Sequence, residues 1–218
     1  MIGRRPLRLY LSSFLVGNRP DRLVSLAGSG ARAALILNAL DNAPAARSEW
    51  RFSQAQALQD LGFTTEEVDL RDYFAAPNRL AAALQDKGLL WINGGNAFLL
   101  RRAMRQSGFD RLIHDLLAVD RLVYAGFSAA ACCAAPTLRG IEFVDDPGAE
   151  AEGYALGIVW DGLGLIDRNL AVHYRSGHSD AAPIEQSIRY YRRKGIPYLA
   201  LSDGQALVVD GADTSVVG

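Results

Sequence analysis

Short apolar runs alternate with segments of helical spacing through the first two-thirds of the chain. The runs typical of buried strands cover residues 7–11, 33–37, 64–70, 89–92 and 122–125. From Phe109 onward, apolar residues recur at positions i, i+3, i+4, i+7 and i+8, which predicts an amphipathic helix. This alternation predicts an α/β fold with a mostly parallel sheet and helices on both of its faces.

The pattern changes after Arg139 to turns and short strands. A strand is expected at 169–172, a helix of about a dozen residues from Pro183, and strands at 198–201 and 206–209. No repeat or low-complexity linker divides the 218 residues, of which 50% are hydrophobic. We therefore expect a single domain over residues 1–218.

Charge, hydropathy and cysteine content limit the partners and the cellular compartment that we expect. The 23 Lys and Arg residues balance 24 Asp and Glu residues, so nothing favours nucleic acid or an anionic membrane as a partner. No run reaches the roughly 18 apolar residues of a membrane span. Cys132 and Cys133 are adjacent and poorly placed to bridge each other, which favours a reducing compartment. We expect a cytoplasmic protein with a small-molecule substrate. The oligomeric state stays open, with a homo-oligomer as one alternative.

Ser128 follows the apolar run that begins at Leu122 and precedes a series of small residues. This order predicts a strand, a sharp turn and a tightly packed helix, the arrangement of a nucleophile elbow. The backbone N–H of Ala129 would then point toward a developing oxyanion. Ala130 replaces the last glycine of the usual G-x-S-x-G pattern. The alternative is a serine that caps an ordinary helix.

A serine nucleophile needs a base, and the chain has three histidines. His114 falls on the polar face of the amphipathic helix. His173 ends the predicted strand at 169–172, and strand ends are where the catalytic groups of open α/β sheets gather. His173 is therefore the preferred base, with His178 as the alternative.

The remaining groups of such a site are an acid and a second oxyanion donor. The buried run at 89–92 leads into a turn containing two glycines, where backbone N–H groups can approach a ligand closely. Glu142 is the preferred acid to orient the histidine. The other acids considered are Asp145 and Asp146 near the turn, and the more remote Asp161, Asp167 and Asp203.

Several segments, taken in order, carry a family resemblance. They are GGNAFLLRRAM, YAGFSAA, APTLRGIEFVDDP, GLGLID with AVHY, IEQSIRYY and LSDGQALVVDG. Together they resemble the peptidase E family of serine peptidases, the aspartyl dipeptidases and their cyanophycinase relatives, over about residues 7–211. The resemblance implies a fold similar to class I glutamine amidotransferases. It also implies Ser128 as nucleophile, His173 as base and Glu142 near the acid, with oxyanion donors at Gly95 and Ala129.

The expected substrate contacts are Asn96 and Arg175. In aspartyl dipeptidases a basic residue recognises the acidic side chain of the substrate, but Ile184 stands where the resemblance would place it. Arg175 or Arg139 could replace it. If neither enters the pocket, neutral N-terminal residues are favoured.

The sequence therefore predicts a serine peptidase that hydrolyses dipeptides or short peptides, with or without N-terminal Asp, through an acyl-enzyme. No metal or cofactor is expected. Two alternatives stay open: a hydrolase of ester or isopeptide bonds on the same fold, and a non-catalytic ligand-binding relative.

Overall fold

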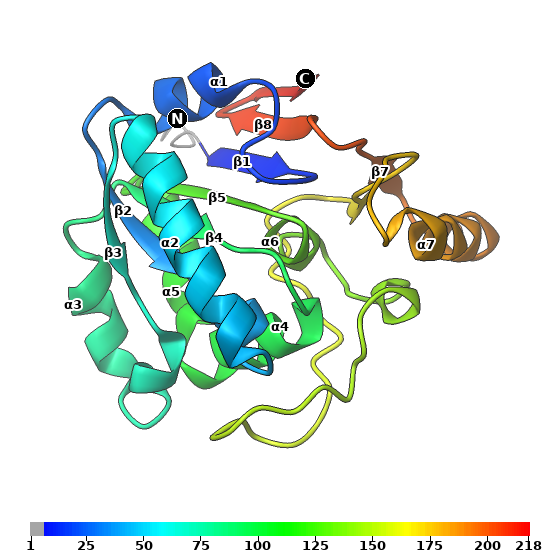
Figure 1. Ribbon diagram of the computed structural model, residues 1–218, viewed down its shortest axis with the longest axis horizontal. Coiled ribbons are helices and arrows are strands. Elements are labelled where there is room, and N and C mark those ends of the chain that lie inside the picture. The colour runs from blue at the N-terminus through cyan, green and yellow to red at the C-terminus, as the bar shows by residue number, and fades with distance from the viewer. Residues whose placement is uncertain (1–6) are drawn as a thin grey trace, which may run out of the picture.

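A seven-stranded sheet forms the centre of the computed structural model, which describes residues 7–218 (Figure 1). Its strands lie in the order β3-β2-β4-β5-β1-β8-β9. Their bounds are Arg8–Ser12 (β1), Arg32–Ile36 (β2), Thr64–Glu67 (β3), Leu89–Ile92 (β4), Val123–Phe127 (β5), Ala206–Asp210 (β8) and Asp213–Val217 (β9). The first five are parallel, whereas β8 and β9 pair antiparallel at one edge. The predicted α/β fold class is confirmed.

Each central strand buries both of its faces. Leu9 and Leu11 of β1 belong to one hydrophobic cluster, and Tyr10 between them belongs to the other. Helices α3 (Leu80–Leu84), α4 (Ala97–Gln106), α5 (Phe109–Ala118) and α6 (Ala129–Cys133) cover the first face. Helices α1 (Pro20–Ala27) and α2 (Pro44–Asp60) cover the second. Figure 1 shows α2 in front of the sheet and α5 behind it.

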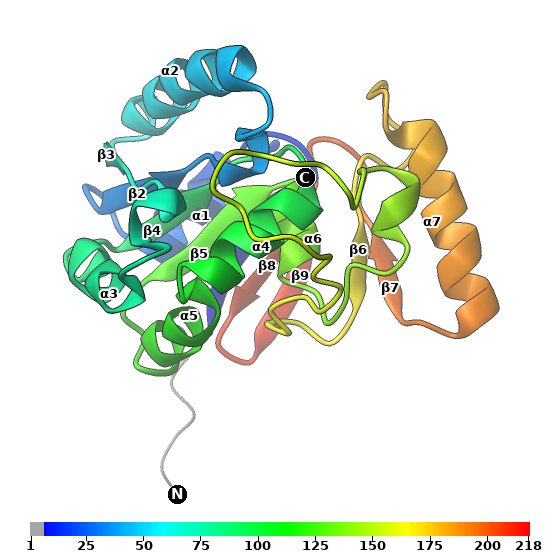
Figure 2. The same cartoon turned by 90° about the horizontal axis from the view of Figure 1, so that it is seen from below.

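A smaller unit lies beside the main sheet, as both Figure 1 and Figure 2 show. Strands β6 (Asn169–Ala171) and β7 (Tyr198–Ala200) pair in parallel, and helix α7 (Ala181–Lys194) packs on them. Ile184, Ile188 and Tyr191 of α7 form a separate buried cluster with Ala171. The 3₁₀ turns are η1 (Asn38–Leu40), η2 (Leu70–Tyr73), η3 (Pro77–Arg79) and η4 (Ile141–Phe143).

The observed elements differ from the predicted ones at a few places. The strand expected at 64–70 ends at Glu67, because Asp69 accepts a hydrogen bond from the Arg71 N–H and caps η2 instead. The exposed strand β9 was not predicted. Residues 1–6 of the expected domain lie outside the described part of the chain. Within residues 7–218, no helix combines the length and apolar character needed to cross a bilayer.

Candidate active site

Ser128 occupies a sharp turn between β5 and α6. Its backbone angles are φ +52° and ψ −110°. A positive φ costs a residue other than glycine about 1–3 kcal/mol, and such residues persist where the surroundings impose them. The half-buried Ser128 donates its backbone N–H to the Ser12 carbonyl at the end of β1, over 3.1 Å. The geometry is the strand–turn–helix arrangement that the sequence predicted.

His173 and Asp203 complete a hydrogen-bonded line behind Ser128. His173 Nε2 lies 3.1 Å from Ser128 Oγ, and His173 Nδ1 lies 2.8 Å from Asp203 Oδ1. The imidazole is buried, and the two bonds fix the ring between the hydroxyl and the carboxylate. An arrangement of this kind can move a proton away from Ser128.

The acid beside His173 is Asp203 and not Glu142, so the prediction for Glu142 is wrong. Glu142 lies in η4, and its carboxylate accepts a hydrogen bond from the Gly140 N–H two residues away. The register of the small sheet explains the difference. Ala171 of β6 pairs with Ala200 of β7, so the residues just beyond both strands reach the same edge. Two short strands that pair in parallel, the first followed by His173 and the second by Asp203, were the signal that could have identified this acid.

Ser13 is a buried group that the sequence analysis missed. Its Oγ accepts the backbone N–H of His173 at 2.8 Å and lies 2.9 Å from Asp203 Oδ1, to which it can donate. It also lies 3.2 Å from the Leu201 carbonyl, but one hydroxyl proton serves one of these acceptors at a time. Ser13 therefore positions both His173 and Asp203. Its place after β1, next to β5, was the available signal.

Burial and hydrogen bonding set the charges of His173 and Asp203. Burial lowers the pKa of His173 below its ordinary value, although the hydrogen bond to Asp203 acts in the opposite direction. Burial alone would raise the pKa of Asp203, but hydrogen bonds from Ser13 and His173 outweigh it and lower the pKa. At neutral pH the pair is therefore a neutral imidazole and a carboxylate, the state required of a general base.

Gly95 and Ala129, the expected oxyanion donors, lie on either side of the serine turn: Gly95 lines the cavity at Ser128, and Ala129 directly follows Ser128. Within residues 7–218, neither N–H donates a hydrogen bond to another backbone or side-chain group. Gly95 has φ +132°, and a Cβ there would lie 2.6 Å from the Ala39 carbonyl oxygen. A Cβ on Gly94 would lie 3.0 Å from the Ser128 Cβ, so the glycine turn closely approaches the serine. That these two N–H groups bind the oxyanion stays a prediction.

Ala130 stands where the usual elbow pattern has glycine. Its methyl group is fully buried and faces Gly126 of β5, where an added Cβ would lie only 2.7 Å away. The missing side chain at Gly126 provides the space that the Ala130 methyl occupies. The departure from the usual pattern is thus accommodated within the same strand–helix unit.

The two residues predicted to contact substrate point elsewhere. Asn96 caps α4: its Oδ1 accepts the Leu99 N–H and its Nδ2 donates to the Asp146 carbonyl, each over 2.9 Å. Arg175 is exposed, with its guanidinium 4.9 Å from the centre of the Tyr174 ring. Neither lines the cavity at Ser128. Arg139, the other arginine considered, stacks on Trp160.

A cavity of about 200 Å³ opens in front of Ser128 and His173. Phe14, Trp50 and Phe127 form apolar parts of its wall. Its polar wall residues besides Ser128 are Asn93, Asp145, Asp180 and the two histidines His173 and His178. No lysine or arginine is among the described residues that line it. The cavity is therefore acidic and suits an uncharged or cationic ligand.

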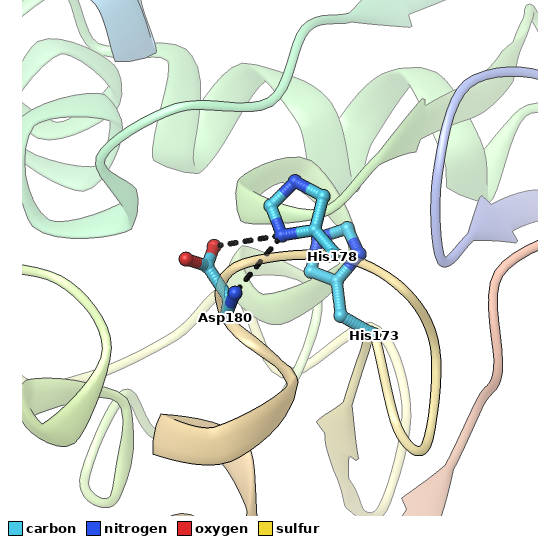
Figure 3. A group of neighbouring side chains, drawn as sticks. All are labelled: His173, His178 and Asp180. Atoms are coloured by element: carbon cyan, nitrogen blue, oxygen red, sulfur yellow. Dashed lines mark hydrogen bonds and ion pairs between the residues drawn. The ribbon is translucent and has the colours of Figure 1, made fainter.

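His178 stacks on the catalytic candidate His173, as Figure 3 shows. The ring centres are 3.8 Å apart and the planes differ by 12°, and His178 Nδ1 lies 3.5 Å from Asp180 Oδ2. Ligand atoms of His173, His178 and Asp180 fall within 4.8 Å of one another, a proximity that the sequence spacing did not predict. However, nitrogen lone pairs lie in the ring planes, so two parallel rings do not direct them at one ion. This arrangement does not fit a shared metal ion without ring rotation.

The sequence model of Peptidase family S51 matches residues 26–217. The chain belongs to this family. The resemblance to the peptidase E family drawn from the sequence is thereby confirmed. A protein of Listeria monocytogenes EGD-e that is named as a peptidase E protein has a similar structure. The TM-score is 0.80 at 20% identity, and the match covers 97% of this chain and 98% of that chain. A peptidase from an acI-B1 Actinobacterium has a TM-score of 0.68 at 16% identity, and the match covers 99% of this chain and 89% of that chain.

Curated relatives match over a shorter stretch. An uncharacterized peptidase of Listeria innocua is 31% identical over 121 residues, which are 56% of this chain and 54% of that protein. A Drosophila melanogaster protein named as a probable alpha-aspartyl dipeptidase is 26% identical over 171 residues, 74% of this chain and 64% of that protein. The matches thus span about half the length of the first relative and under two thirds of the second.

Proposed function

We propose that this protein is a serine peptidase that hydrolyses dipeptides or short peptides through an acyl-enzyme. The observation that carries the proposal is the hydrogen-bonded line from Ser128 Oγ through His173 to Asp203, at a cavity that Ser128 and His173 both line. Membership of a peptidase family supports the same reaction class.

The residues suggest a role for each group. Ser128 Oγ attacks the scissile carbonyl while His173 Nε2 takes the hydroxyl proton. The N–H groups of Gly95 and Ala129 stabilise the oxyanion, and protonated His173 gives its proton to the leaving amine. Water, deprotonated by His173, then attacks the ester, releases the acid and restores Ser128. Asp203 keeps a proton on His173 Nδ1 and stabilises the imidazolium.

The size and setting of the cavity support a small peptide as substrate. Its volume of about 200 Å³ suits a short chain better than a folded protein. The name of the Drosophila relative, an alpha-aspartyl dipeptidase, points to the same substrate size. The free buried thiols of Cys132 and Cys133 favour action in the cytoplasm.

Labelling with a fluorophosphonate probe, combined with a panel of dipeptides, tests the proposal. Wild-type protein should be labelled at Ser128, and a folded Ser128→Ala variant should remain unlabelled and lose about 10⁶-fold in kcat. A variant that retained more than about a tenth of the activity would contradict a serine mechanism. Peptide binding without labelling or turnover would identify a ligand-binding protein, and turnover of esters alone would identify an esterase.

A further inference from the structure

One wall of the cavity carries a buried acceptor with no donor. Asn93 is 1% exposed, lines the cavity and follows β4 directly. Its Nδ2 donates to the Gly94 carbonyl over 2.9 Å, but its Oδ1 has no hydrogen-bond partner within residues 7–218. An unmatched buried acceptor costs about 1–3 kcal/mol, so this oxygen is suited to a donor supplied by a ligand.

Two carboxylates line the same cavity. Asp145 Oδ2 accepts the Ala97 N–H over 2.8 Å at the start of α4, and Asp180 lies near enough to repel its charge. Burial is the main cause that raises the pKa of Asp145 to about 7, with Asp180 adding to the effect. No arginine or lysine of the described chain lines the cavity to offset these charges. A cationic ligand would do so.

The nitrogen of a substrate's first residue lies close to the carbonyl group that Ser128 would attack. It is separated from the scissile carbonyl carbon by only the Cα atom, and that carbon must approach Ser128 Oγ. Asn93 and Asp145 line the same small cavity as Ser128, and a Cβ on Gly94, next to Asn93, would lie 3.0 Å from the Ser128 Cβ. An α-ammonium group supplies three donors and one positive charge.

Resting on the proposed peptidase function, we propose that Asn93 and Asp145 bind the free α-ammonium group of the substrate's N-terminal residue. Asp180 adds negative charge to the same site. The peptidase therefore requires a free N-terminus and disfavours acidic residues at the first position. An acidic side chain there would lose its hydration and meet two carboxylates with no cation to pair with.

Two matched substrate pairs test the proposal on wild-type protein. N-acetylation of Ala-Leu removes the ammonium group and should lower kcat/KM about 10- to 100-fold, the range expected for hydrogen bonds to a charged group. Asn-Leu and Asp-Leu have nearly the same shape, and the aspartyl substrate should be the poorer by about tenfold or more. Equal hydrolysis of both acetylated and free substrates, or a preference for Asp-Leu, would overturn the inference.

Asp145→Asn tests the site from the protein side. The amide oxygen of asparagine can still accept the Ala97 N–H, so the start of α4 keeps its cap. KM for free Ala-Leu should rise about 10- to 100-fold, while hydrolysis of the acetylated analogue stays within about twofold. The control is Asp146→Asn, because Asp146 is exposed and its carboxylate accepts the Gly148 N–H instead of lining the cavity.

Fluorophosphonate labelling separates the two proposals. Wild-type protein that is neither labelled nor active would refute the peptidase function itself. Wild-type protein that is labelled and active, but whose Asp145→Asn variant treats free and acetylated substrates as before, would refute only the ammonium site. Loss of labelling in folded Asp145→Asn would place Asp145 in the activation of Ser128 and would also overturn the inference.

Discussion

At the scale of single residues, two consecutive serines hold Ser128 and His173 in place. Ser128 and His173 both have positive φ angles, +52° and +59°, which are costly for residues other than glycine. The Ser12 carbonyl accepts the N–H of Ser128, and the Ser13 hydroxyl accepts the N–H of His173. The end of β1 therefore fixes both strained residues, and with them the 3.1 Å separation of Ser128 Oγ and His173 Nε2.

Asp203→Asn should remove most of the activity without unfolding the protein. An amide at this position can no longer hold the proton on His173 Nδ1, and kcat should fall by about 10⁴-fold. Glu142→Gln is the matched control, since Glu142 contacts the backbone of its own turn. Its kcat should stay within about threefold of wild type. Steady-state kinetics of both variants measure the difference.

The pH profile gives Asp203→Asn a second measurement. The base must be neutral, so activity is lost as the pH falls through the pKa of His173, which lies below its ordinary value. Because Asp203 raises that pKa, its replacement should move the acid limb to still lower pH. An unchanged acid limb in Asp203→Asn, together with a large loss of activity in Glu142→Gln, would restore Glu142 as the acid.

At the scale of helices and strands, local patterns predicted the elements and missed their pairing. Strand β4 and the start of α5 match their predicted positions, because apolar runs and helical spacing are properties of neighbouring residues. Asp203 lies 30 residues beyond His173, and only the register of β6 with β7 brings them together. Ser13 likewise reaches His173 across 160 residues. Local spacing contains no information about such contacts.

The unit formed by β5 and α6 provides a test of the unusual elbow. In Ala130→Gly the helix gains a flexible residue and loses a buried methyl group, so stability should fall by about 1–2 kcal/mol. The kcat/KM should stay within about threefold, because the missing side chain at Gly126 already provides the space for the methyl group. Thermal unfolding and steady-state kinetics measure the two effects.

Ala131→Gly is the control for that variant. It makes the same exchange at a buried position of the same helix, one residue further from Ser128. Similar losses of stability in both variants would reflect the helix propensity and the buried methyl group that both exchanges remove. A rise of about tenfold in kcat/KM for Ala130→Gly, absent from Ala131→Gly, would show that the alanine strains the elbow.

At the scale of the whole molecule, the site lies where two sheets meet. The main sheet contributes Ser128 and Ser13, whereas β6 and β7 of the small sheet lead into His173 and Asp203. Between them lies a cavity with one unmatched buried acceptor and two carboxylates, and no lysine or arginine of residues 7–218 lines it. Groups arranged for a ligand in this way reduce the stability of the empty protein.

Asp145 makes this loss of stability measurable. Its pKa is raised from 3.8 to about 7, mainly by burial, so the folded protein keeps a proton that the unfolded chain has lost. The contribution of Asp145 to stability therefore falls as the pH rises from about 4 to 7, by at most about 4 kcal/mol. Asp145→Asn should stabilise the protein at pH 8, and the gain should shrink toward pH 5. Urea unfolding at both values measures it.

Asp146→Asn again serves as the control, because its exposed carboxylate should leave the stability nearly unchanged at both pH values. The pH dependence of the gain in stability from Asp145→Asn distinguishes ionisation of the carboxyl group from a change in packing or hydrogen bonding. A gain for Asp145→Asn of equal size at pH 5 and pH 8 would come from packing or hydrogen bonding. It would contradict a carboxyl group that is neutral in the folded protein at pH 5 and ionised at pH 8. A gain that is larger at pH 8 than at pH 5 would instead mean that the protein without ligand carries an unpaired charge at Asp145, where a substrate cation binds.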